Sequence, residues 1–245
     1  MQLVFIDARF EGEVKLGDEV LTHIKDNNVK SVALFASVNF LGLDIVKKQL
    51  IEAGCDILTT KAKRTHVPTQ ILGCDSYEDS YEEDIISKAD MVLYVGDGMF
   101  HPKALLLSQT FRKDIKDVII WDPVAGGMKV INRATIQKQL NRTKGNLTRF
   151  LVAQTIGVLV TTKPGQQYLH QAQKLKEHLK TIDKKCYVFI SDTIDIHHLE
   201  NYPFIDAWVN TACPRIGQDD ITTITKPMIN IKEAFDPGKA LEDLA

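Results

Sequence analysis

The sequence predicts an α/β protein with two similar parallel-sheet domains, related by internal duplication and sharing a cleft at the carboxyl ends of their strands. Two observations predict this fold class. Apolar, β-branched runs alternate with segments of helical spacing along the chain, an order typical of parallel sheets covered by helical crossovers. Segments 34–60 and 159–191 also share one plan, in which strand, turn and helix precede a cysteine that opens a strand. We place the domains at 1–148 and 149–245.

The first domain is expected to alternate strands with helices. Its strands are predicted at 3–6, 31–37, 55–60, 91–96 and 118–123. Its helices are predicted at 40–54, 80–89 and 102–111. Gly54 fits the position just after a helix, and Pro102 fits the first position within one. A polar loop after the third predicted strand ends at Cys74.

A polar, basic helix at about 133–150 leads to the second domain, with the boundary region around 145–156. The strands of this domain are predicted at 157–162, 186–192, 205–211 and 227–231. Its helices are predicted at 165–180 and, in a short form, at 194–201. The repeated strand–helix order predicts a second parallel sheet.

The composition excludes several classes of protein. Hydrophobic residues make up 44% and charged residues 25% of the 245 residues, as in ordinary globular proteins. The formal net charge of -2 argues against a broad nucleic-acid-binding surface. No apolar run is long enough to span a bilayer, and the first residues lack the features of a signal peptide. We therefore expect a cytoplasmic protein without direct nucleic-acid or membrane binding.

The four cysteines fall into two kinds. Cys55 and Cys186 open predicted strands, so they are expected at the amino edges of the sheets as small buried side chains. Cys74 and Cys213 follow strands and lie on the carboxyl side, where ligands of α/β proteins gather. Two such thiols could hold zinc or an iron–sulfur centre. Because no CxxC spacing is present, two unrelated thiols remain the alternative.

Three glycine-containing turns follow predicted strands at the same edge, at 96–102, 122–127 and 161–166. Glycine lets the backbone approach a ligand closely, and a helix that follows offers its N-terminus to an anion. His101 stands beside the first of these turns. A GxGxxG dinucleotide fingerprint is absent from them. Together the turns predict a binding cleft.

Five segments in a fixed order carry a resemblance to a known family. They are "RTHVPTQILGC" (64–74), "YVGDGMFHP" (94–102), "WDP" (121–123), "TTKPGQ" (161–166) and "VNTACPRIGQDD" (209–220). From about Leu3 to Ile231 the chain resembles the radical enzymes of diphthamide synthesis, the 2-(3-amino-3-carboxypropyl)histidine synthases. The resemblance implies three similar α/β domains, each giving one cysteine to a [4Fe–4S] cluster whose open iron binds S-adenosylmethionine. It also implies transfer of a 3-amino-3-carboxypropyl group to a histidine of translation elongation factor 2, the first step of diphthamide synthesis.

The resemblance assigns roles to residues within the matching motifs. Cys74 matches the cluster cysteine of the family's middle domain, and Cys213 matches that of its last domain. The residues expected to hold S-adenosylmethionine are Gly96, Gly98, His101, Thr162, Lys163, Pro164, Gly165, Gln166 and Arg215. Arg215 is the candidate partner of its carboxylate.

One departure from the family leaves three hypotheses open. No segment matches the family's first domain and its cysteine. The chain is therefore expected to be a split or shortened synthase subunit, working as a homo- or heterodimer or with a chain or small molecule that supplies the third ligand. The alternative is a non-catalytic scaffold or electron-handling partner of a complete paralogue. The third is a two-domain protein that binds an anionic metabolite at the turns 96–102 and 161–166.

Overall fold

The chain folds into two compact α/β units in the computed structural model, which describes residues 9–220 and 224–244. The first unit comprises the described residues up to Thr110 together with Asp114–Ile136. The second comprises Phe111–Lys113 and the described residues from Gln137 onward. The predicted boundary at 148/149 falls inside helix α4 (Arg133–Val152), whereas the division between the units follows Ile136.

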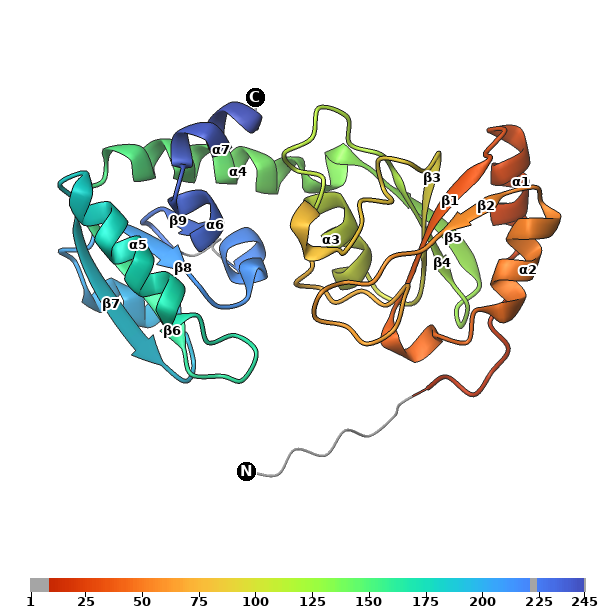
Figure 1. The fold of residues 1–245 in the computed structure, drawn as a ribbon, viewed down its shortest axis with the longest axis horizontal. Helices are drawn as coiled ribbons and strands as arrows, with labels where there is room; N and C mark the ends of the chain where they lie inside the picture. Colours follow the sequence, from red (N-terminus) through yellow and green to blue (C-terminus); the bar gives the residue numbers. More distant parts are fainter. Residues whose placement is uncertain (1–8, 221–223, 245) are drawn as a thin grey trace. The chain divides into compact units, whose positions relative to one another are not determined.

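The first unit is built on a five-stranded sheet (Figure 1). In spatial order its strands are β2 (Asp56–Leu58), β1 (Ser31–Ala36), β3 (Met91–Val95), β4 (Val118–Asp122) and β5 (Gly127–Ile131). The first four are parallel, and β5 is antiparallel to β4. The sequence pattern did not predict β5, since Lys129 and Val130 are exposed and only Ile131 is fully buried. Gly126 closes the tight turn before β5 at φ +65°.

Helices cover both faces of this sheet. Helices α1 (Asp18–Asp26) and α2 (Asp44–Glu52) bury Val20, Ile24, Val46 and Leu50 in one core cluster with strands β1 and β3. Helix α3 (Phe100–Leu107) lies on the opposite side of the sheet (Figure 1). Burial of these apolar stripes is the main force that holds a unit of this kind together.

The second unit has a four-stranded parallel sheet. Its strands, in spatial order, are β7 (Lys185–Ser191), β6 (Thr155–Thr161), β8 (Ala207–Asn210) and β9 (Met228–Asn230). One face packs in a core with helices α4, α5 (Leu169–Thr181), α6 (Ile231–Ala234) and α7 (Pro237–Asp243). The other face packs Trp208 against the 3₁₀ helix η3 (His197–Asn201). The indole lies over Gly157, where any larger residue would collide with it.

Most predicted strands are confirmed to within two residues. The strand predicted at 3–6 lies outside the described residues. The helix predicted at 80–89 is wrong: only a 3₁₀ turn at Glu78–Ser80 precedes bends and turns there. Glu82 N donates to Lys61 O (2.9 Å) and Glu83 N donates to Thr60 Oγ1 (3.1 Å), so these groups bind the preceding loop in place of helical carbonyls.

Four helix starts also differ from prediction. Helix α2 begins at Asp44 and not at 40, and η3 begins at His197 and not at 194. Helix α3 begins at Phe100, which puts Pro102 at its third position and not at its first. Proline is tolerated there because the first N–H groups of a helix have no intrahelical acceptor. Helix α5 begins at Leu169 and not at 165. The glycine turn after β6 is therefore longer than predicted.

Candidate functional site

The segment that carries Cys74 is joined to the carboxyl end of β1. Ala36 N donates to Thr69 O (2.9 Å), and Ile71 N donates to Ala36 O (3.1 Å). This short parallel bridge between Ala36 and Gln70 extends the sheet by one step. Cys74 follows three residues after Ile71, beyond the end of the strand.

A tight turn at 72–75 presents Cys74. Asp75 N donates to Leu72 O (3.0 Å), and Leu72 N donates back to Asp75 Oδ2 (2.8 Å). Tyr81 Oη donates to Asp75 O (2.9 Å). Asp75 is buried, and burial raises the pKa of its carboxyl group, although the Leu72 N–H and the charge of Arg64 act in the opposite direction. The turn leaves Cys74 half-buried.

Two neighbours complete the surroundings of Cys74. Arg64 Nη2 donates to Cys74 Sγ. A guanidinium beside a thiol favours the thiolate, which is the form that binds metals. The ring of Phe100 occupies the space where a side chain at Gly73 would lie. The Cys74 turn is thereby packed against the first residue of α3, next to His101.

The glycines after β3 are required by close packing and by backbone conformation. Gly96 has φ +154° and Gly98 has φ +65°. A Cβ at Gly96 would meet Tyr94 Oη at 2.7 Å and Ser37 Oγ at 2.9 Å. The His101 ring lies 6.5 Å from the Tyr94 ring and 5.6 Å from the Phe100 ring. The first unit therefore gathers Cys74, the glycine turn and His101 beyond the ends of β1 and β3.

In the second unit, the turn 162–166 follows β6. Thr162 N donates to Ser191 O (3.1 Å), and Lys163 N donates to Thr161 Oγ1 (3.1 Å). Gly165 has φ +76°, a backbone conformation that residues other than glycine rarely adopt. Thr162, Lys163, Pro164 and Gly165 are exposed, so these residues are accessible to a ligand.

A pair of buried asparagines shapes the turn that carries Cys213. Asn210 Nδ2 donates to Cys213 O and to Asn230 Oδ1, both at 2.8 Å, and Ala212 N donates to Asn210 Oδ1 (3.0 Å). Asn230 Nδ2 donates to Pro214 O (3.0 Å). The last residues of β8 and β9 thus fix the backbone around Cys213, which is half-buried.

Arg215, two residues beyond Cys213, is buried and bound to Asp219. Its Nε lies 2.6 Å and its Nη2 2.5 Å from Asp219 Oδ2. Two of its N–H groups are thus directed to a carboxylate of the same chain. Its role as the partner of a ligand carboxylate stays a prediction.

The residues that brace the two turns were not predicted from the sequence. Arg64, Asn210 and Asp219 lie within the quoted motifs, and Asp75 follows Cys74 directly, so their positions offered a signal. The sequence offered no signal for Asn230. It lies outside the quoted motifs, and it meets Asn210 only because strands β8 and β9 pair in the folded chain.

The other two cysteines are poorly placed to bind a metal. Cys55 is buried and its Sγ donates to Val29 O (3.4 Å); burial raises the pKa of its thiol. Cys186 lies within β7, and burial raises the pKa of its thiol to about 11. Thiols with raised pKa values stay protonated near neutral pH and are poor metal ligands.

The residues of the candidate site fit some of the requirements for binding a cluster through thiolates. Each unit presents one half-buried thiol on a braced turn, as a cluster ligand requires. Within residues 9–220 and 224–244, no group of three or more His, Cys, Asp or Glu side chains lies close enough to hold a metal ion. The roles of Cys74 and Cys213 as metal ligands stay predictions.

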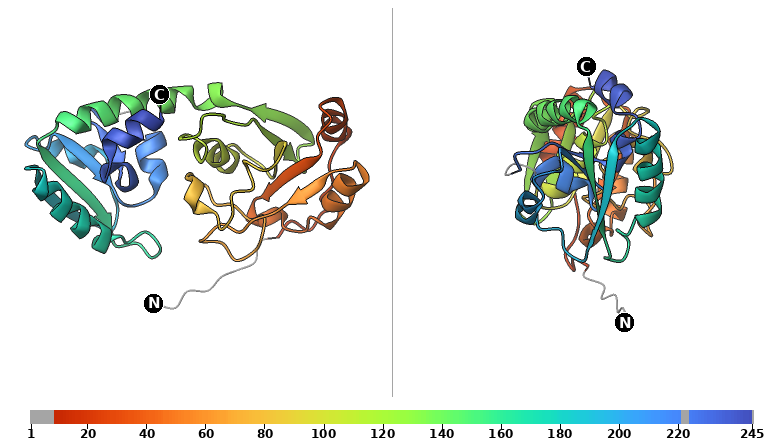
Figure 2. Two further views of the ribbon diagram at one scale, coloured as in Figure 1. Left: turned by 45° about the horizontal axis from the view of Figure 1, so that its top comes forward. Right: turned by 90° about the vertical axis from the view of Figure 1, so that its left-hand side faces the viewer.

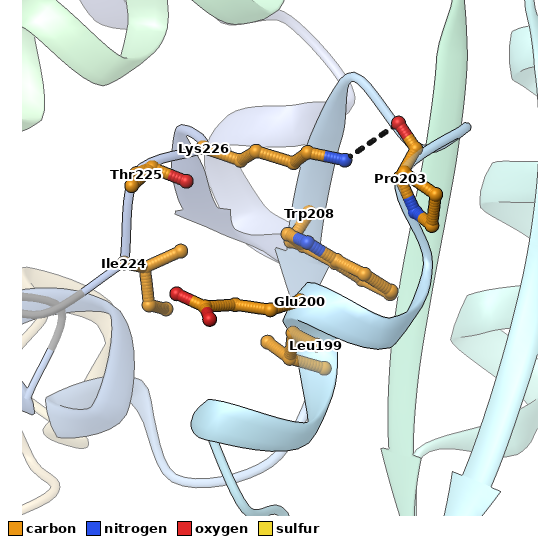
Figure 3. Close-up of a pocket in the computed structure, with 7 residues that line it drawn as sticks. All are labelled: Leu199, Glu200, Pro203, Trp208, Ile224, Thr225 and Lys226. Carbon is orange, nitrogen blue, oxygen red and sulfur yellow. Dashed lines mark hydrogen bonds between the residues drawn. The ribbon is translucent and has the colours of Figure 1, made fainter.

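A separate cavity lies in the second unit, with a volume of about 210 Å³. Its lining residues are Leu199, Glu200, Pro203, Trp208, Ile224, Thr225 and Lys226 (Figure 3). Lys226 Nζ donates to Tyr202 O (3.0 Å) and to Pro203 O (2.9 Å). None of the predicted site residues lines this cavity.

In the described part of the chain, no helix has the length and apolar character needed to cross a membrane.

Known proteins are similar to this chain in sequence and in fold. A 2-(3-amino-3-carboxypropyl)histidine synthase of Pyrococcus horikoshii is 28% identical over 166 residues, which are 68% of this chain and 44% of that protein. Subunit 1 of the corresponding synthase of Mus musculus is 25% identical over 244 residues, 99% of this chain and 51% of that protein. The chain thus spans about half the length of the curated relatives it matches.

A solved structure is also similar to this chain in fold. Dph2 from Pyrococcus horikoshii, crystallised with a 4Fe-4S cluster, matches with a TM-score of 0.72 at 25% identity, over 93% of this chain and 62% of that one. The family model described as "Putative diphthamide synthesis protein" matches residues 1–236. This chain belongs to that family of diphthamide synthesis proteins.

Proposed function

We propose that this chain supplies two ligands, Cys74 and Cys213, to a [4Fe–4S] cluster in an enzyme of diphthamide synthesis. The enzyme transfers the 3-amino-3-carboxypropyl group of S-adenosylmethionine to a histidine of translation elongation factor 2 in the cytoplasm. The observation that carries this proposal is the contrast among the four thiols. Cys74 and Cys213 are presented on turns braced by hydrogen bonds, whereas burial raises the pKa values of Cys55 and Cys186.

The names of the relatives support the transferase activity, and the cluster in the Dph2 structure supports the cofactor. When bound, the cluster would supply the electron for reductive cleavage of S-adenosylmethionine. In this chain, Cys74 and Cys213 would hold it as thiolates, with Arg64 stabilising the thiolate of Cys74.

The surrounding turns would hold the donor substrate. Gly96 and Gly98 allow the backbone to approach a ligand, and His101 lies beside them. The exposed turn from Thr162 to Gln166 offers polar groups in the second unit. These residues would orient the sulfonium and exclude water from a reactive species. The Arg215–Asp219 pair would position the Cys213 turn.

The third thiolate of the cluster would come from outside these 245 residues. A homo- or heterodimeric partner, a separate chain or a small molecule would supply it. The name "subunit 1" of several relatives supports an assembly of more than one chain.

Anaerobic reconstitution tests the proposal. Wild type, Cys74→Ala and Cys213→Ala are loaded with iron and sulfide, with and without a candidate partner chain, and studied by EPR. Cys186→Ala is the matched control, because its thiol lies within a strand. We expect a reducible four-iron signal that is lost in both site variants and kept in the control, together with cleavage of S-adenosylmethionine.

Other outcomes would redirect the assignment. No stoichiometric iron under any condition would contradict the proposal and favour the scaffold hypothesis. Zinc in place of iron, or an unrelated anion bound at the turns 96–102 and 161–166, would favour the metabolite-binding hypothesis.

A further inference from the structure

The cavity in the second unit is built around a hydrogen-bond donor that has no acceptor. It lies on the face of the second sheet that helix α5 does not cover (Figures 1 and 2). Trp208 is fully buried there, and no described residue accepts a hydrogen bond from its Nε1. The rings of Phe189 and Tyr202 meet the indole edge to face, with centroids 5.1 Å and 6.1 Å away, and hold it in place. A buried N–H without an acceptor is costly, so the indole favours a ligand that can accept.

The indole nitrogen faces the cavity. A Cβ at Gly157 would lie 2.3 Å from Cζ3 and 2.4 Å from Cε3 of Trp208, so this edge of the ring faces β6. Nε1 is on the opposite edge of the ring, which faces β9 and the residues that lead into it. Figure 3 shows the nitrogen between the side chains of Lys226 and Glu200. The donor is therefore directed into the space that these residues line.

The cavity combines apolar walls with a charged rim. Leu199 and Trp208 are buried, and Ile224 is half-buried beside them. Glu200 is exposed at the rim. Lys226 Nζ donates to two backbone carbonyls, and an ammonium group has three N–H groups, so one remains for a ligand. The cavity thus offers a neutral donor, a cation and an anion around an apolar space.

We propose that this cavity binds a free α-amino acid with an apolar side chain. The ligand carboxylate accepts from Trp208 Nε1 and from the remaining N–H of Lys226. The ligand ammonium pairs with the Glu200 carboxylate, and the apolar side chain packs against Leu199 and Ile224. This inference goes beyond the proposed function and does not depend on a cluster.

Size and charge both favour this class of ligand. Sites for drug-sized molecules measure about 300–1,000 Å³, whereas this cavity has a volume of about 210 Å³. A purely apolar ligand would leave the indole N–H without an acceptor. A ligand with only a negative charge would lie against Glu200, and one with only a positive charge would lie against Lys226. A small molecule that carries both charges satisfies all three polar groups.

The indole N–H signal of Trp208 in an NMR spectrum reports on binding. Isotope-labelled full-length chain is titrated with L-leucine, and Trp121→Phe identifies the signal of Trp208 as the one that remains. We expect a saturable downfield shift, because the N–H then donates to a carboxylate, with a dissociation constant below about 1 mM. Isoamylamine lacks the carboxylate of leucine and isocaproate lacks its ammonium. Each should bind at least about tenfold more weakly than leucine.

A charge-removing variant tests the rim. Glu200→Gln keeps the shape of the side chain and removes the charge that the ammonium needs. The dissociation constant of L-leucine should rise at least about tenfold. Glu177→Gln, at an exposed position on α5, is the matched control and should leave it unchanged. Circular dichroism checks that both variants fold.

Three results would overturn the proposal. A Trp208 signal that L-leucine does not move would mean that the cavity holds only water. Equal binding of L-leucine, isoamylamine and isocaproate would mean that the cavity is apolar and unselective. An unchanged dissociation constant in Glu200→Gln would mean that leucine binds elsewhere. The titrations use protein without iron, so their failure would contradict the amino-acid site alone and leave the proposed function as it stands.

Discussion

The two thiol-bearing turns both lie beyond strand ends, in the β2–β3 connection of the first unit and the β8–β9 connection of the second, but are held in different ways. The Cys213 turn follows its strand directly and is fixed by the neutral amides of Asn210 and Asn230. The Cys74 turn ends a long irregular loop and depends on the carboxylate of Asp75 and the hydroxyl of Tyr81. The contrast shows two ways to hold a half-buried thiol on a turn. A hydrogen-bond network of neutral amides has a stability that does not change with pH, whereas a network that includes a carboxyl group has a stability that does.

The largest effect is expected from Asn210→Ala. The change leaves Ala212 N, Cys213 O and Asn230 Oδ1 without the bonds that Asn210 provides. Unsatisfied buried groups are costly, so the free energy of unfolding of the second unit should fall by about 3 kcal/mol. Urea unfolding followed by Trp208 fluorescence, in a Trp121→Phe background, measures it. Asn141→Ala, on the exposed surface of α4, should change it by less than about 0.5 kcal/mol. Equal effects of the two variants would contradict the buried network.

A somewhat smaller loss is expected from Asp219→Ala. Asp219 accepts two N–H groups of the buried Arg215. Hydrogen bonds to charged groups contribute about 1.5–3 kcal/mol, so the same unfolding assay should show a loss of about 2 kcal/mol. Asp243→Ala, at an exposed position in α7, is the control. If Asp219→Ala keeps full stability and its Arg215 becomes available to an added carboxylate, the guanidinium is a ligand group and not a brace.

Much of the fold was predictable from local patterns. Apart from β5, the described strands are largely apolar and β-branched, and each lies within two residues of its predicted bounds. Segment 80–89 failed because an acidic, amphipathic composition is compatible with a helix, while the loop at 60–63 takes up its backbone groups. Strand β5 was missed because a half-exposed antiparallel strand carries little apolar signal.

The candidate site was predictable only in its outline. The order of strands and turns indicated that Cys74 and Cys213 lie in loops beyond strand ends. The contacts that hold them depend on tertiary approach, as between Asn210 and Asn230 or between Gly73 and Phe100. No local pattern encodes such contacts, since they form only when segments distant in the sequence meet in the folded chain.

The pH response should separate the two turns. Burial raises the pKa of Asp75 in the folded state above its value in the unfolded chain. The stability linked to this group is complete below the unfolded pKa of about 4, and is lost as the pH rises through the folded pKa. The melting temperature of Asp75→Asn, relative to wild type, should therefore increase from pH 4 to pH 7.

Thermal melts of the two proteins across this pH range measure the difference. Asp56→Asn, at an exposed position in β2, should show no such trend. A constant difference between Asp75→Asn and wild type would show that the carboxyl group keeps its ordinary pKa. Asn210→Ala should also melt with a difference from wild type that does not vary with pH.

The smallest effect is expected at Arg64, and it bears on the thiol itself. Arg64 Nη2 donates to Cys74 Sγ, whereas Arg215 near Cys213 is bound to Asp219. Because the guanidinium stabilises the thiolate, Arg64→Ala should slow alkylation of Cys74 by iodoacetamide about threefold, leaving Cys213 unchanged. Mass spectrometry of timed samples measures both rates, and Lys63→Ala, at the neighbouring exposed position, is the control. Faster alkylation of Cys74 would mean that Arg64 shields the thiol more than it activates it. The two turns would then differ in access to the thiol and not in its charge.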